Sequence, residues 1–205
     1  MKINIKLMKR LARQILRPIL RFKQINMRQS EVSKTALVEL INHVGESDLI
    51  MIEIGSYRGE SAELFLSTGK VKKLYCVDPW AMYYDADDGA SFSDMHKVEC
   101  DFDRRVGADK RVVKVKGSID TFVEKHSTLK EKIDFVYIDG LHTYEGVRHD
   151  IEIVRDKIKP RIAIAGHDYC PGLWDGAVKA VHEQLGKPDA TFQDTSWLIF
   201  TDDKS

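Results

Sequence analysis

Short apolar runs alternate with amphipathic stretches along most of the chain. The run LIMIEI at residues 49–54 is almost wholly apolar, which is typical of a strand buried on both faces. Four further runs predict strands of the same kind, at residues 73–77, 111–115, 133–138 and 161–165. The intervening stretches repeat apolar residues at helical spacing, so we expect helices at residues 33–44, 60–66, 95–106, 119–123, 144–158 and 177–185.

The last part of the chain departs from this alternation. Residues 190–193 and 197–201 predict two strands joined by a turn that is too short for a helical crossover, so the strands should run antiparallel. Five strand–helix alternations followed by a hairpin predict an α/β fold. We expect a Rossmann-like three-layer sandwich around a mostly parallel seven-stranded sheet, with an antiparallel C-terminal hairpin.

A glycine turn follows the first predicted strand. Gly55 and Gly59 separate that strand from the next helix, so backbone N–H groups and the positive end of the helix should face one crevice. The second predicted strand runs into Asp78, at the position where a doubly wound fold places the acid that binds ribose hydroxyls. The two features together predict an adenosine-containing ligand.

Charge is unevenly distributed along the 205 residues, although the formal net charge is zero. Residues 1–28 carry nine Lys or Arg and no acid, which leaves 23 bases against 32 acids, a net charge of −9, in residues 29–205. A body that acidic is not expected to bind nucleic acid, which favours a basic face. The full chain has 43% hydrophobic and 31% charged residues, as in an ordinary globular protein, and we expect residues 29–205 to form a single domain.

The basic segment 1–28 also contains bulky apolar residues near helical spacing. Three interpretations stay open: a helix that packs on the domain or on a second subunit of a homo-oligomer, peripheral attachment to an anionic membrane surface, or a disordered arm. Charges interrupt every candidate apolar core, so we expect neither a secretory signal nor a membrane-spanning helix. Cys76, Cys100 and Cys170 form no C-x-x-C, which favours a reducing compartment and a cytoplasmic location, with the inner face of the membrane as the peripheral alternative.

Residues 79–110 read as a long insertion that begins as a loop and ends as a helix. The loop part contains Trp80 and several acids, among them Asp88. Because long irregular stretches in compact domains are usually functional lids or mobile segments, we expect a lid here.

Polar side chains follow several of the predicted strands. Ser118 follows the third strand, Asp139 and His142 the fourth, and His167 and Asp168 the fifth. Since open α/β sheets bind ligands beyond the carboxyl ends of their strands, these groups should face one crevice. Each has a plain alternative, because an Asp-Gly pair is often only a turn and a lone His is often only a loop residue. Acid and imidazole groups after two adjacent strands favour a site.

The pattern E-x-G-x-x-x-G-x-S followed by V-D resembles the class I S-adenosylmethionine-dependent methyltransferases. The resemblance implies that the glycine loop faces the amino-acid part of the cofactor, that the acid after strand two holds the ribose, and that the residue after strand three lines the adenine. Tyr57 stands where many members have a middle glycine. The cofactor-binding residues implied here are Glu53, Gly55, Ser56, Gly59, Ser61, Asp78, Ser118 and Asp139.

The runs D-G-x-H-x-Y-E and H-D-Y, at residues 139–145 and 167–169, are more specific. They resemble the sugar-hydroxyl branch of that class, which includes macrolide-sugar and rhamnosyl O-methyltransferases. The resemblance implies Mg²⁺ ligands at Asp139 and Asp168 and a catalytic base at His142. Relatives often have a second acid where this chain has His167, a further catalytic candidate, and a glycine pair where it has Arg161-Ile162.

An aliphatic alcohol resists ionisation much as water does, with a pKa of about 15.7 that a bound metal can lower greatly, whereas a phenol ionises near ~10. An imidazole base with a carboxylate-held Mg²⁺ therefore suits a sugar hydroxyl. The leading hypothesis is an S-adenosylmethionine-dependent O-methyltransferase acting on a sugar or glycan, as in polysaccharide biosynthesis. The alternatives are a catechol-type phenol as the small-molecule acceptor, or a nucleotide-binding module without catalysis.

Overall fold

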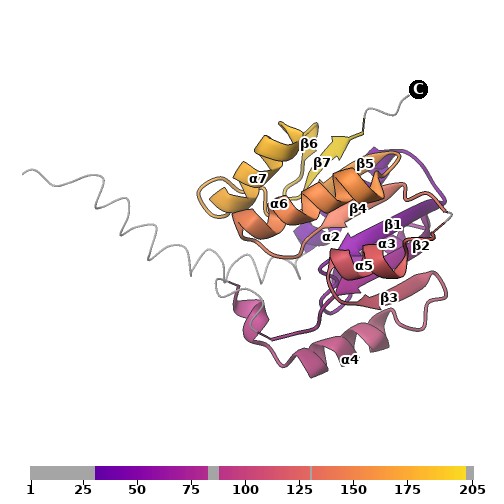
Figure 1. Cartoon of the computed structure of the whole chain (residues 1–205). Coiled ribbons are helices and arrows are strands. Elements are labelled where there is room, and N and C mark those ends of the chain that lie inside the picture. Colours follow the sequence, from indigo (N-terminus) through magenta and orange to yellow (C-terminus); the bar gives the residue numbers. More distant parts are fainter. Residues whose placement is uncertain (1–30, 83–87, 130, 202–205) are drawn as a thin grey trace, which may run out of the picture.

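A computed structural model describes residues 31–82, 88–129 and 131–201 of the chain. Its seven strands form one sheet in the order β3-β2-β1-β4-β5-β7-β6 (Figure 1). The first five strands of the chain pair in parallel, β7 runs antiparallel to β5, and β6 runs antiparallel to β7. The strands are β1 (Leu49–Ile54), β2 (Val71–Asp78), β3 (Val112–Lys116), β4 (Phe135–Ile138), β5 (Ala163–Gly166), β6 (Ala190–Thr191) and β7 (Trp197–Phe200). The predicted fold class, including the antiparallel hairpin, is confirmed.

Helices cover both faces of the sheet, because the strands between them are apolar on both sides. Figure 1 shows α5 (Ile119–Lys125), α6 (Tyr144–Ile153) and α7 (Asp175–Leu185) on the near face. Their buried residues share one apolar cluster with the near side of the strands. A second cluster joins the other side of the sheet to α2 (Glu31–Val44), α3 (Glu60–Ser67) and α4 (Met95–Arg105). These are the three layers that the alternation predicts.

The helix α4 connects β2 to the parallel strand β3. Its buried residues Met95, Val98 and Phe102 pack into the cluster on the far face together with Trp80. The second half of the predicted insertion is thus the crossover helix of the sheet. Before it lies a short 3₁₀ helix, η1 (Gly89–Phe92), which the sequence pattern did not predict. Residues 83–87 of the predicted lid lie outside the described residues, as does the basic segment 1–28, and both interpretations stay predictions.

Several predicted boundaries differ from the structure, among them the starts of β4 and β5 and the end of α6. The fourth and fifth strands begin two residues later than predicted, at Phe135 and Ala163. Asp134, just before β4, accepts bonds from the backbone N–H of Ile50 and from the guanidinium of Arg161. The helix expected over residues 144–158 ends as a π-helical turn, η2 (Val154–Ile158). There Lys159 adopts a φ of 53° and donates to the carbonyl of Val154, just before Pro160.

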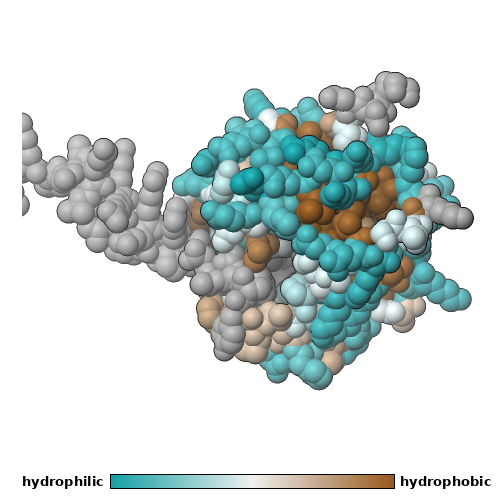
Figure 2. All heavy atoms as spheres, in the orientation of Figure 1, coloured by the Kyte–Doolittle hydropathy of each residue, from teal (hydrophilic) through white to brown (hydrophobic). Residues whose placement is uncertain are grey.

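None of the described helices has both the length and the apolar character needed to cross a bilayer. The visible surface is largely hydrophilic, with apolar side chains gathered between α5 and the end of α6 (Figure 2). A hollow there is lined by apolar residues such as Val123 and Ile158 and by basic ones such as Lys132. It lies at the amino ends of β4 and β5, opposite the edge where α/β sheets bind ligands.

Candidate active site at the carboxyl ends of the strands

The glycine turn after β1 brings two strand ends into contact. Gly55 adopts a φ of 88°, and its N–H donates to the carbonyl of Val77 at 2.8 Å. A β-carbon at this position would lie 2.0 Å from the carbonyl oxygen of Asp139, at the end of β4. Only glycine allows the chain leaving β1 to pass this close to the chain leaving β4.

The next residues of the turn hold Asp78. Tyr57 adopts a left-handed φ of 45°, which a glycine would take without strain, and its N–H donates to Asp78 Oδ2 at 2.8 Å. The N–H of Trp80 donates to Asp78 Oδ1 at 2.6 Å, and the Trp80 indole donates to the Tyr57 carbonyl. Burial raises the pKa of Asp78. The two backbone N–H groups act in the opposite direction, because they favour the ionised carboxylate, but burial has the larger effect. The carboxylate is fixed by one bond on each oxygen and can accept further donors from the cavity that it lines.

The residues Glu53, Ser56 and Ser61 are also close together. The hydroxyl of Ser56 donates to Glu53 Oε2 at 2.6 Å, and Ser61 bonds the same carboxyl group. Burial raises the pKa of Glu53 to about 7, although these hydroxyls act in the opposite direction. Ser56 and Ser61 line a small hollow beside the glycine turn, whereas Glu53 is fully buried behind it. In this arrangement Glu53 holds the serines of the turn, and its direct contact with a ligand stays a prediction.

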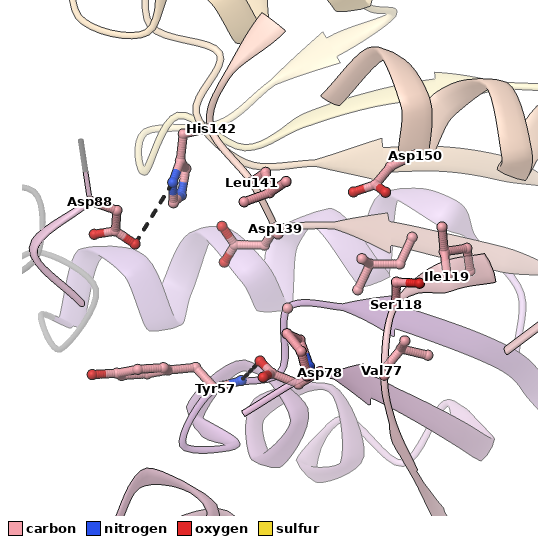
Figure 3. Close-up of a pocket in the computed structure, with 15 residues that line it drawn as sticks. Tyr57, Val77, Asp78, Asp88, Ser118, Ile119, Asp139, Leu141, His142 and Asp150 are labelled. Atoms are coloured by element: carbon pink, nitrogen blue, oxygen red, sulfur yellow. Dashed lines mark hydrogen bonds and ion pairs between the residues drawn. The ribbon is translucent and has the colours of Figure 1, made fainter. Parts of the chain in front are cut away.

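A cavity of about 180 Å³ opens along the carboxyl ends of β1, β2, β3 and β4 (Figure 3). One end is lined by Ile119 and by the N-cap residue of α5, Ser118, and Leu141 lies between this end and His142. Asp78 lies in the middle region, and Asp88 and His142 lie at the other end. Of the predicted residues, the cavity brings together Gly55, Asp78, Ser118, Asp139 and His142. Gly59, which has a φ of 77°, begins α3 and lies outside it.

Acids and imidazoles gather at that second end. His142 Nε2 lies 2.9 Å from Asp168 Oδ2, and His167 Nδ1 lies 3.0 Å from Asp168 Oδ1. Asp139 Oδ1 lies 3.7 Å from His167 Nδ1, and Asp88 Oδ2 lies 3.8 Å from His142 Nδ1. Burial alone would raise the pKa of Asp168, but the charges and bonds of the two imidazoles hold it well below its usual range. The predicted grouping of residues after β4 and β5 is therefore present in space.

Aromatic residues hold this cluster in place. The ring of His142 stacks on Trp174, with centroids 4.7 Å apart. Trp197 of β7 packs against Gly166, where a β-carbon would lie 2.8 Å from the indole, and its Nε1 donates to the carbonyl of His167 at 3.1 Å. Asp168 follows with a left-handed φ of 65°, a strained conformation that is typical of functional sites.

A divalent cation fits the donors at this point. Asp139, His142 and Asp168 each offer one ligand atom, and these atoms lie within 4.8 Å of one another. Carboxylate oxygens suit Mg²⁺, while imidazole suits softer divalent ions, so the set does not by itself select one metal.

The sequence interpretation missed four residues of the site. Asp88 appeared only as one of several acids in the insertion, and Trp174 gave no signal, because its contact with His142 is purely tertiary. Leu141 is a single apolar residue in a loop. Asp150 could have been noticed, because it is an acid beside Val147 and Ile151 on the inward-facing stripe of a helix.

The sheet order is that of the class I S-adenosylmethionine-dependent methyltransferases. A family model described as a methyltransferase domain matches residues 52–169, and the chain belongs to this family. Among solved structures, a calicheamicin methyltransferase superposes with a TM-score of 0.60 at 14% identity, covering 87% of this chain and 83% of the other. An O-methyltransferase from Bacillus cereus, in complex with SAH, gives 0.57 at 12% identity, covering 93% and 91%.

A curated relative from Acanthamoeba polyphaga mimivirus, an uncharacterized protein, is 25% identical over 142 residues. The match covers 69% of this chain and 61% of the relative's length. The solved structures, at these low identities, establish the fold alone.

Proposed function

We propose that the protein is an S-adenosylmethionine-dependent O-methyltransferase. The proposal is carried by one observation: the same cavity is lined by Asp78 and by the acid–imidazole cluster around His142. Bound there, the cofactor would place its ribose at Asp78 and its amino-acid part at the glycine turn. Its methyl group would then lie toward His142. The SAH complex of the Bacillus cereus structure supports the choice of cofactor.

Asp78 is the residue on which the cofactor assignment can be tested. A bond from a ribose hydroxyl to an ionised carboxylate contributes about 1.5–3 kcal/mol. Asp78→Ala should therefore weaken the binding of S-adenosylhomocysteine about tenfold or more in isothermal titration calorimetry. Asp109→Ala, which removes an acid paired with Arg111 outside the cavity, is the control. Equal affinities of wild type and Asp78→Ala would contradict the assignment.

We infer a hydroxyl group of a sugar or glycan as the acceptor. The acceptor oxygen attacks the methyl carbon, the bond from that carbon to sulfur breaks, and its electron pair stays on sulfur. The hydroxyl proton must leave, and His142 is placed to take it. When Nε2 of His142 carries the proton, it donates to Asp168 Oδ2, 2.9 Å away. The lone pair that can accept a proton is then on Nδ1, on the side of Asp88.

Asp139 and Asp168 are the proposed ligands of a divalent cation, with Mg²⁺ as the expected ion and His142 within reach of the same position. Such an ion would supply Lewis-acid help in ionising an aliphatic hydroxyl. Without it, His142 and His167 are the proposed proton acceptors.

Activity measurements separate these roles. His142→Ala should reduce turnover about 10²–10⁴-fold with S-adenosylhomocysteine affinity nearly intact, since general-base help is of that size. His96→Ala, which removes an exposed imidazole on α4, should leave both unchanged. Asp139→Asn or Asp168→Asn should abolish activity or make it depend on excess metal. Full activity in EDTA would reject the metal and leave an imidazole base.

An acceptor panel decides between the substrate classes. Methylation of rhamnosides and other sugar hydroxyls is expected, and turnover of catechols alone would favour the phenol hypothesis. Binding of S-adenosylhomocysteine with no turnover of any hydroxyl would favour a module without catalysis.

A further inference from the structure

The acid Asp150 has no role in the function described so far. It lies in the middle of α6, between the buried residues Val147 and Ile151, on the face that packs inward. Its side chain is partly buried and lines the cavity. In Figure 3 the carboxyl group of Asp150 points into the cavity on the side of Ser118 and Ile119, away from Asp88.

The carboxyl group of Asp150 has no hydrogen bond or ion pair within the described parts of the chain. Neighbouring acids differ in this respect, since Asp120 bonds His149 and Glu152 bonds Arg148. Burial raises the pKa of Asp150 to about 7, against the nearby charge of His149. A carboxyl group without a donor from the protein must take its donors from what fills the cavity that it lines, either water or a ligand. Its surroundings therefore indicate a binding role.

The surroundings of Asp150 also indicate which part of a ligand it would meet. The cofactor would have its ribose at Asp78 and its methyl group toward His142, so the adenine must occupy the remaining end of the cavity. That end has apolar walls from Ile119 and from Ile54, which lies near Asp150, and such walls suit the flat faces of a purine. Adenine presents one hydrogen-bond donor at its edge, the 6-amino group. Asp150 is the acid that lines this end.

We propose that Asp150 binds the 6-amino group of the cofactor's adenine and selects adenine over purines that lack this donor. The residue comes from the helix after β4, whereas the sequence pattern placed the adenine contact at Ser118 after β3. An oxygen at position 6, as in hypoxanthine, would face the carboxylate with an acceptor and be disfavoured. This inference rests on the proposed cofactor, and its test separates the two.

The test compares two ligands by isothermal titration calorimetry at pH 8: S-adenosylhomocysteine and its 6-deamino analogue, in which purine replaces adenine. The wild type should prefer the adenine compound about tenfold or more, because a bond to a charged acceptor is lost in the analogue. Asp150→Ala should reduce this ratio to near one. Asp150→Asn should keep a several-fold preference, since its carboxamide oxygen still accepts from the amino group.

Glu152→Gln is the matched control, because it removes an exposed acid of the same helix that pairs with Arg148, and its ratio should equal that of the wild type. Circular dichroism checks that each variant is folded. The same ratio in wild type and Asp150→Ala would overturn the role of Asp150 and leave the cofactor assignment standing. If neither compound binds the wild type, the proposed cofactor fails and this inference fails with it.

Discussion

The closest backbone approach in the site predicts what an added methyl group at Gly55 would do. In Gly55→Ala the β-carbon would lie 2.0 Å from the carbonyl oxygen and 2.5 Å from the carbonyl carbon of Asp139, and 2.9 Å from the α-carbon of Gly140. All three atoms are backbone, so no side chain can swing aside, and the end of β4 must move by about 1 Å to restore normal contact. The displaced residue carries a proposed metal ligand.

Two terms set the size of the effect. A non-glycine residue at a left-handed φ costs about 1–2 kcal/mol, and forcing extra volume into a packed site costs about 1–3 kcal/mol more. Gly69→Ala isolates the first term, because Gly69 has a φ of 71° with nothing within 4 Å of the added carbon. Lower entropy of the unfolded chain offsets about 0.4–1 kcal/mol in both variants. The difference between the two variants should therefore be about 1–3 kcal/mol.

Urea denaturation measures this difference directly. For a slope of about 1–3 kcal/mol per molar, Gly55→Ala should unfold at roughly 1 M lower urea than Gly69→Ala, with the same slope. Binding of S-adenosylhomocysteine should weaken in Gly55→Ala and be unchanged in Gly69→Ala. If Gly55→Ala is as stable as Gly69→Ala, the contact between the two strand ends is not as tight as the geometry requires, and the argument is refuted.

Two further predictions concern Glu53 and the basic segment. Because burial raises the pKa of Glu53 from 4.5 to about 7 in the folded state, stability should fall as the pH rises through this window and stay lower above it, by at most about 3 kcal/mol. Glu53→Gln should remove that fall in urea denaturation at pH 5 and pH 9, and parallel pH profiles of variant and wild type would contradict it. We also propose that residues 1–28 attach the protein to anionic lipid, each base contributing at most about 1 kcal/mol. The full chain should then co-sediment with anionic liposomes and release at high salt, whereas a chain starting at Gln29 should not. Equal behaviour of the two chains would favour packing of residues 1–28 on protein.

The elements of this fold could be predicted from the sequence because their signals are local. A buried parallel strand such as β1 is a short apolar run, and a covering helix such as α7 repeats apolar residues every three to four positions. Gly55 and Asp78 could be placed for the same reason, since both stand at the end of a recognisable strand. The end of α6 could not, because the π-helical turn depends on how Lys159 and Pro160 leave the helix.

The contacts between the side chains of the site could be seen only in the tertiary structure. Asp139, His142, His167 and Asp168 were expected at one edge, because parallel strands end there together, but their pairing was not. Asp168 lies between two imidazoles, with His142 stacked on Trp174, and these contacts join segments whose spacing in the chain has no fixed period. Asp88 and Asp150 reach the cavity from a 3₁₀ N-cap and from the middle of a helix. Local patterns identify the strands and helices, and side chains from separate elements meet only where the packing of the three layers brings them together.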